Sequence, residues 1–309
     1  MRYPFPDNKP LRAIVVAATI VASMLVSLSL AFLIVKVTLP GLFGVADPVA
    51  FMASQPAQIA YPQATLYMQV ITSSVGLFLI PSLMFLMLFR ADMADRLRLS
   101  LPAAKYWLVA ILTMISAGIF IQLLVQLMQL IPLPPVLQSM RAAGETIDKM
   151  LNAFFAGTTP GYFVALTLAM ALMPAIAEEA FFRGTLQNTL RDFGITPIGA
   201  IVISGFTFAV IHMEFDNTLG IWCMGVVLGL LYYYTDSLWV CITAHFLNNF
   251  MIVAFKYYHM TGVIRQDLVS TDALPPYYTI PAGLVMVAGL VILSRWSGRK
   301  LTAPRFDYI

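Results

Sequence analysis

Charged residues are scarce in this sequence. Asp, Glu, Lys and Arg make up 11% of its 309 residues, whereas a soluble domain usually carries about a quarter. This shortage, together with 60% hydrophobic residues, excludes a soluble globular protein. The two cysteines, Cys223 and Cys241, lie in apolar stretches without CxxC spacing, which argues against a disulfide framework or a thiolate zinc site. Because the net charge is only +3 and the basic residues are scattered, we expect no nucleic-acid partner.

Long apolar runs are abundant instead. A helix needs roughly 20 mostly apolar residues to cross a bilayer core of ~30 Å, and about eight runs approach this length. Most Lys and Arg residues fall in one set of alternate loops, so the positive-inside rule places both termini in the cytoplasm. The predicted fold class is therefore all-α, a polytopic transmembrane helical bundle whose partner is the lipid bilayer. The predicted spans are Ala13–Val35, Leu66–Phe89, Tyr106–Ile131, Tyr162–Leu190, Pro197–Met213, Thr218–Tyr234, Leu238–Phe255 and Ile280–Ser294.

We expect a single integral-membrane domain over residues 1–309. The sequence carries no P-loop, GxGxxG motif, internal repeat or separate soluble segment. Between the third and fourth runs, Val136–Phe155 alternates apolar and polar residues at helical spacing, which favours an amphipathic helix on the membrane surface. Any chemistry must therefore lie inside the bundle.

Two adjacent carboxylates interrupt the fourth run. Ionisable residues inside a membrane span cost several kcal/mol and usually mark a functional site or a compensated pair. On a helix, Glu179 and Arg183 lie four residues apart on one face and can pair, whereas Glu178 is turned about 100° away. We therefore predict a structural Glu179–Arg183 pair, with Glu178 left to act as a general base or acid. The alternative is that this stretch is only the hydrated end of a long span.

Histidine is as scarce as cysteine, and its placement is informative. Two of the three histidines, His212 and His245, lie within or at the edge of neighbouring apolar runs. His245 and Asn249 share one helix face, and Phe208 precedes His212 by one turn, where we expect it to fix the imidazole rotamer. One buried histidine is most often a packing residue. Two beside a carboxylate-bearing span favour a catalytic site.

Three short motifs thus stand in order on separate predicted helices: EExxxR at Glu178, FxxxH at Phe208 and HxxxN at His245. Together they resemble the motifs of the CAAX protease and bacteriocin-processing (CPBP, or Abi) family of intramembrane proteases, which includes the type II CAAX prenyl endopeptidases. The resemblance covers roughly residues 160–256, which would form the catalytic core. It implies an eight-helix fold, and we expect an integral protein of a bacterial cytoplasmic membrane.

The resemblance implies hydrolysis of a peptide bond in a membrane-associated protein or peptide. Glu178 would be the base that activates water, assisted by His212, while His245 and Asn249 would hold the developing oxyanion. A neutral imidazole and an amide donor suit an oxyanion in a low-dielectric site. This mechanism needs no cofactor.

Three alternatives stay open. Glu178, His212 and His245 could instead form a His₂Glu zinc site with an open position. In that arrangement no carboxylate is left to act as the base unless Glu179 gives up its pairing with Arg183. The sequence also has no HExxH motif, the usual signature of zinc proteases. A membrane transporter or proton relay would also use buried Glu and His, and predicts helices broken by Gly or Pro at the site. The third alternative is a catalytically silent immunity or scaffolding member of the family.

Overall fold

The computed structural model describes residues 9–89, 93–132, 138, 149–157, 159–269 and 274–302. These residues form helices and no strand, which confirms the predicted all-α fold class. Among them, seven helical stretches are long and apolar enough to cross a membrane. They are α1 (Lys9–Phe43), α4–η1–α5 (Pro62–Leu88), α7 (Ala104–Gln129), α9–η2–α10–η3–α11 (Pro160–Asp192), α13 (Thr218–Thr235), α14 (Leu238–Met260) and α15 (Pro276–Ser297).

The fifth predicted span, Pro197–Met213, forms a helix with nearly the predicted bounds, but this helix is short for a membrane span. Helix α12 (Pro197–His212) has 16 residues, so at ~1.5 Å per residue it extends about 24 Å, less than a bilayer core of ~30 Å. Seven helices rather than eight therefore meet the length requirement in the described chain. The amphipathic helix predicted at Val136–Phe155 lies mostly outside the described residues, and its described end, residues 149–154, is helical. Other short helices between the spans include α2 (Pro48–Ala53), α3 (Gln55–Ala60) and α6 (Met93–Leu97).

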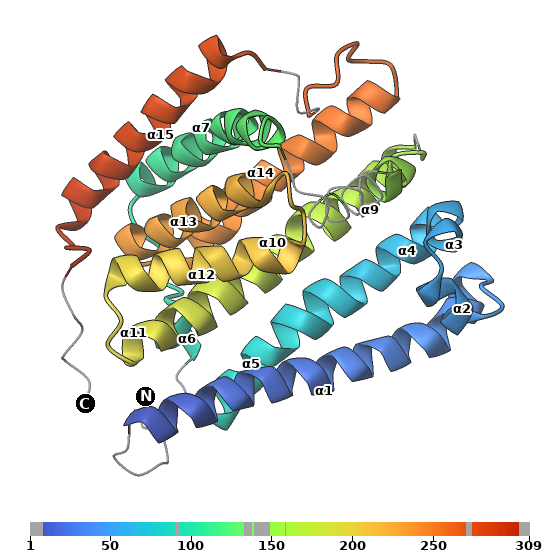
Figure 1. Ribbon diagram of the computed structural model, residues 1–309, viewed down its shortest axis with the longest axis horizontal. Helices are drawn as coiled ribbons and strands as arrows, with labels where there is room; N and C mark the ends of the chain where they lie inside the picture. The colour runs from blue at the N-terminus through green and yellow to red at the C-terminus, as the bar shows by residue number, and fades with distance from the viewer. Residues whose placement is uncertain are drawn as a thin grey trace.

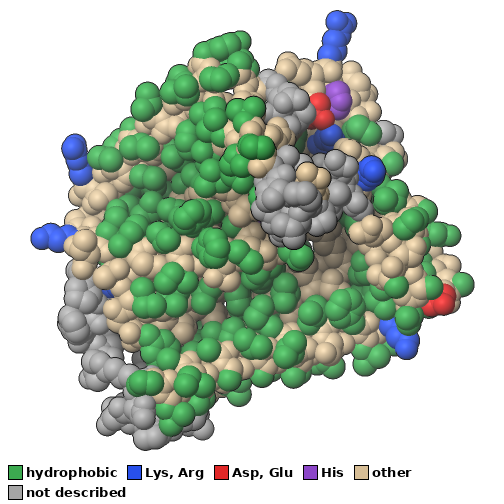
Figure 2. All heavy atoms as spheres, in the orientation of Figure 1, with side chains coloured by type: hydrophobic (Ala, Val, Ile, Leu, Met, Phe, Trp, Pro, Cys, Tyr) green, Lys and Arg blue, Asp and Glu red, His purple; other side chains and the backbone are tan. Residues whose placement is uncertain are grey.

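The long helices run roughly side by side (Figure 1), with α1 and the α4–α5 stretch at one side, α7 and α15 at the other, and α10, α12, α13 and α14 between them. Helix α1 begins and α15 ends at the same end of the bundle, and the cytoplasmic location of that end stays a prediction. Hydrophobic side chains cover the middle of the face in Figure 2, while Lys and Arg lie towards its margins. Such a distribution suits a lipid environment.

The two polypeptide stretches that carry the first two motifs start in the same way. Thr159 caps Pro160 at the start of α9 by accepting a hydrogen bond from the backbone N–H of Tyr162. Thr196 caps α12 by accepting from the N–H of Gly199, again with proline at the first helical position. Both sequences follow the usual helix-start rules, because the hydroxyl satisfies an orphan N–H and proline lacks the N–H that would be orphaned.

The helix that carries Glu178 is continuous but locally widened. It contains two π-helical segments, η2 (Thr167–Leu172) and η3 (Ala180–Gln187), which flank α10 (Met173–Glu179). Segment η2 ends just before Pro174, where the proline ring would otherwise clash with a carbonyl in the preceding turn. A second π-helical segment followed by a proline is found where η1 (Val70–Leu79) precedes Pro81. Such widened turns are frequent at functional sites.

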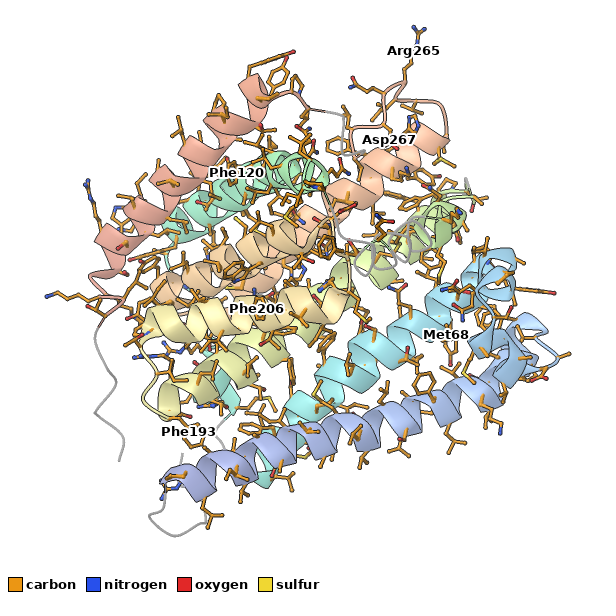
Figure 3. The ribbon with its side chains drawn as sticks, viewed as in Figure 1. Met68, Phe120, Phe193, Phe206, Arg265 and Asp267 are labelled. Carbon is orange, nitrogen blue, oxygen red and sulfur yellow. The ribbon has the colours of Figure 1, made fainter. Side chains whose placement is uncertain are left out.

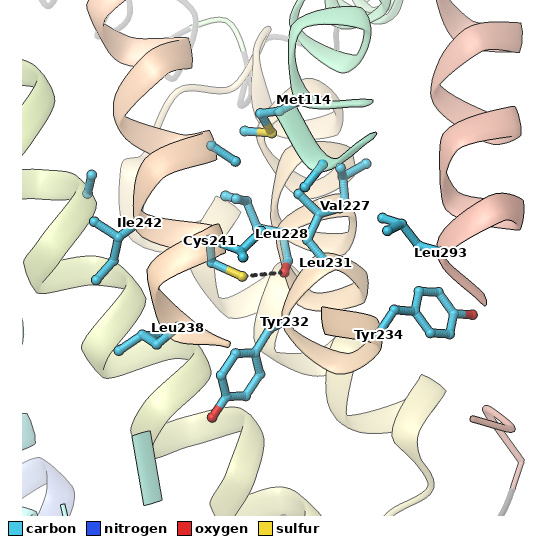
Figure 4. Packing of buried hydrophobic residues seen from close by; sticks show 14 of the residues in the cluster. Met114, Val227, Leu228, Leu231, Tyr232, Tyr234, Leu238, Cys241, Ile242 and Leu293 are labelled. Carbon is cyan, nitrogen blue, oxygen red and sulfur yellow. Dashed lines mark hydrogen bonds between the residues drawn. The ribbon is translucent and has the colours of Figure 1, made fainter. Parts of the chain in front are cut away.

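Small residues set the closest helix approaches. A Cβ on Gly225 of α13 would lie 2.8 Å from the Cα of Gly205 on α12, so the two backbones touch there. On the far side, Phe120 of α7, labelled in Figure 3, packs where Gly283 of α15 leaves room. The apolar cluster between α7, α13, α14 and α15 is completed by fully buried residues, among them Leu228 and Cys241, whose thiol contacts the Leu228 carbonyl (Figure 4).

Candidate active site

Glu178 and Glu179 end α10 in the interior of the bundle. Their exposed fractions are 8% and 0%, so this stretch is not simply the hydrated end of a span. Helix α10 packs against α14, which carries His245. The two glutamates, although turned about 100° apart, both reach that one imidazole.

Glu179 joins Arg183 to His245. The Arg183 Nε lies 3.0 Å from one carboxylate oxygen of Glu179, which confirms the predicted pair, and the other oxygen lies 2.8 Å from His245 Nδ1. Because a carboxylate paired with arginine can only accept, the His245 Nδ1 carries a hydrogen and donates it. Glu179 therefore does more than neutralise Arg183, since it also fixes the orientation of the imidazole. The sequence prediction of a self-contained pair missed this contact.

Arg183 is held by more than its carboxylate partner. Its exposed fraction is 1%, and its Nη2 donates to the carbonyl of Gly225 on α13 at 3.2 Å. Its guanidinium also lies over the ring of Phe208, 5.3 Å from the centroid, where cation–π attraction adds to the ion pair. The arginine thus ties the Glu179 carboxylate to both α12 and α13.

Glu178 faces the other side of the same imidazole. Its Oε2 lies 3.8 Å from His245 Nε2, which is too far for a direct hydrogen bond. One oxygen atom placed to the side could reach both groups, because two contacts of ~2.8 Å span this gap at an angle of about 85°. With His245 Nδ1 donating to Glu179, a neutral imidazole presents only a lone pair at Nε2. Donation from Nε2 to an oxyanion would therefore require the imidazolium, and the oxyanion role of His245 stays a prediction.

His212 ends α12 and approaches the site through Phe208. Its Nδ1 lies 2.7 Å from the Phe208 carbonyl oxygen, so Nδ1 donates and Nε2 keeps its lone pair. The Phe208 ring packs on His212 with centroids 4.6 Å apart, as predicted, and it also meets the His245 ring at 6.1 Å. Among the described residues, His212 has no recorded polar contact with Glu178. Its assisting role is left as a proposal.

Asn249 lies one turn beyond His245 on α14. The side-chain oxygen of Asn249 accepts a hydrogen bond from the Nδ2 of its neighbour Asn248 at 3.2 Å. In the described part of the chain this is the one recorded side-chain contact of Asn249, so its own NH₂ group has no protein partner. The sequence pattern drew attention to Asn249 and missed Asn248.

The residues suggested for zinc do not form a metal centre in this arrangement. Over the described ranges, no three His, Cys, Asp or Glu side chains are grouped closely enough to hold a metal ion. The His245 Nδ1 is engaged by Glu179 and the His212 Nδ1 by its own helix, so a zinc ion would have to bind the Nε2 atoms of these two rings. The zinc alternative is left to the metal analysis proposed below.

A cavity of about 700 Å³ opens beside the site, between α7, α14 and the loop that joins α12 to α13. Its wall is mostly apolar, with Met251, Ile252 and Phe255 of α14 among the lining residues, and it includes Glu214 of the loop. Asn248 lines it as well, one turn from His245. An apolar cavity with a few polar residues in its wall has the general form of a ligand site, although Glu178, His212, His245 and Asn249 are not among the lining residues.

Residues 160–251 match the model of the family described as type II CAAX prenyl endopeptidase, Rce1-like. The matched segment contains all three motifs and runs from the first residue of α9 to the middle of α14. The resemblance to the CAAX protease family is thereby confirmed for this segment. Searches among curated proteins and among solved structures found no match to the chain.

Proposed function

We propose that this protein is an intramembrane endopeptidase of the CAAX protease type, which hydrolyses a peptide bond in a membrane-associated protein or peptide. Its partners would be the lipid bilayer and that substrate, its location a bacterial cytoplasmic membrane, and residues 160–256 its catalytic core. The observation that carries the proposal is the buried array Arg183–Glu179–His245–Glu178, which crosses from α10 and η3 to α14. The family match over residues 160–251 supports peptide hydrolysis as its chemistry.

Glu178 is the base of the proposed reaction. Among the two glutamates it is the one with no arginine partner, and its carboxylate faces the gap beside His245 Nε2. A water molecule in that gap would lose a proton to Glu178 while its oxygen attacks the carbonyl carbon of the peptide. When the C–N bond breaks, Glu178 returns the proton to the departing amine. His212, with a free lone pair at Nε2, would assist this proton transfer.

His245 and Asn249 hold the negative charge that develops on the carbonyl oxygen. His245 acts as the imidazolium, because its first hydrogen is given to Glu179 and only the second, at Nε2, can reach the oxyanion. Asn249 adds its NH₂ group. Donors that are fixed in place before the reaction stabilise an oxyanion more strongly than mobile water does, since no reorganisation is needed.

The alternatives draw less support from the structure. A transporter site predicts a broken helix near Glu178. Residues Pro160–Asp192 are instead helical throughout, and the widened turn before Pro174 accommodates the proline without a break. A silent family member has no need of the complete set of motif residues, and the chain retains Glu178, His212, His245 and Asn249. Peptide hydrolysis uses all of them.

The first test is to find the substrate. Glu178→Gln protein should retain bound peptide that wild-type protein cuts, so trapping with the variant and mass spectrometry should identify polypeptides that wild type converts into two fragments. Cleavage by purified wild-type protein should continue after chelator treatment, and elemental analysis should find far less than one metal per chain. Stoichiometric zinc whose removal and return switch cleavage off and on would contradict the mechanism. Absence of any cut polypeptide would contradict the function.

A further inference from the structure

Asn248 occupies an unspecified position within the HxxxN motif, yet it contacts the proposed oxyanion donor. It is 8% exposed on α14, and its Nδ2 donates to Asn249 Oδ1 at 3.2 Å. An asparagine amide has one accepting and one donating end, and a rotation of ~180° exchanges them. An Asn249 with its oxygen turned towards a developing oxyanion would repel the charge it is meant to hold. A donor fixed on the oxygen of Asn249 prevents this exchange.

The other end of the Asn248 amide lies against Gly118 of α7. A Cβ placed on Gly118 would lie 2.7 Å from Asn248 Oδ1, so the missing side chain at Gly118 is what makes room for that oxygen. With its oxygen against Gly118 and its nitrogen on Asn249, the Asn248 amide spans the space between α7 and the site. It also forms part of the wall of the cavity.

We propose that Asn248 is a positioning residue, which fixes the Asn249 amide so that its NH₂ group is directed to the oxyanion, and that Gly118 provides the space this requires. The role depends on the oxyanion function proposed above for Asn249. Asn248 itself touches neither the reacting carbonyl nor the water. Its loss should therefore lower the rate of the chemical step and leave substrate affinity nearly unchanged.

Asn248→Asp tests this with little change of shape, because the aspartate offers only acceptors to Asn249 Oδ1. We expect kcat to fall about tenfold or more with KM close to wild type, and the thermal unfolding midpoint to fall as well, because the aspartate adds a charge at a position that is 8% exposed. In an Asn249→Ala background the same substitution should cause no further loss, since no amide remains to be positioned. The exposed Asn152 supplies the matched control Asn152→Asp, which should keep full activity.

Gly118→Ala provides an independent variant that introduces no charge. The added methyl group must displace Asn248 Oδ1, so kcat should fall in the wild-type background and not in Asn249→Ala. If both variants fold and keep wild-type kcat while Asn249→Ala is strongly impaired, the positioning role is wrong and the oxyanion role survives. If Asn249→Ala itself is fully active, both are wrong. Equal losses in the two backgrounds would also overturn the positioning role, because Asn248 would then act independently of Asn249.

Discussion

Glu178→Gln should lower turnover of the purified protein by ~10²–10⁴, the usual contribution of a general base. The amide has nearly the same size and shape as the carboxylate and cannot accept the water proton. Within the described chain, the one ion-pair contact of Glu178 is with His245 Nε2, at the long distance of 3.8 Å. The thermal unfolding midpoint should therefore change little, and steady-state cleavage kinetics with an unfolding scan on the same preparation would check both.

Asp47→Asn is a suitable control for this experiment, because it is also a change from an acid to its amide. Asp47 is exposed and caps α2 by accepting hydrogen bonds from the N–H groups of Val49 and Ala50, which an asparagine oxygen can also accept. Its activity should stay within about twofold of wild type, since surface-loop changes of this kind are usually small. Residual activity of Glu178→Gln within about tenfold of wild type would reject Glu178 as the base.

Removing one member of the Glu179–Arg183 pair should have the largest effect on stability. Both side chains are essentially buried, so Glu179→Ala or Arg183→Ala leaves an uncompensated charge inside the protein, at a cost of about 3–5 kcal/mol. The double variant should lose clearly less than the sum, because neither charge is then left alone. Unfolding free energies from a double-mutant cycle would measure the coupling, and strict additivity would mean that the two charges do not interact.

The same variants separate two roles of Glu179. Glu179→Gln keeps an oxygen that can still accept from His245 Nδ1, although it weakens the interaction with Arg183. It should therefore retain more activity than Glu179→Ala, which loses the His245 contact entirely. Equal activity of the two variants would argue that Glu179 acts through Arg183 alone.

Much of the fold follows from local patterns in the sequence. Apolar runs of sufficient length locate the long helices, and Thr-Pro pairs mark the starts of α9 and α12. The widened turns before Pro81 and Pro174 were not predicted, because helical periodicity assumes ~3.6 residues per turn throughout. The bounds of α12 were predicted to within one residue, and the error was to count a run of this length as a full membrane span.

The site shows the same division between local and long-range information. The i, i+4 spacing predicted the contact between Glu179 and Arg183, and the one-turn spacing predicted that Phe208 packs on His212. The His245–Glu179 bond joins residues 66 positions apart on different helices, so no spacing rule could find it. The proposed role of Asn248 could not be predicted from spacing either, because it depends on Gly118 of α7 as much as on the neighbouring Asn249.

Cleavage of the trapped polypeptide in water enriched in ¹⁸O tests the central claim most directly. If water activated by Glu178 attacks the peptide carbonyl, wild-type protein should release two fragments, one of which carries a single heavy oxygen at its new carboxyl terminus. Glu178→Gln should release almost none over the same period, while Asp47→Asn should match wild type. Intact polypeptide after incubation with wild type, or equal labelling by wild type and Glu178→Gln, would contradict the account.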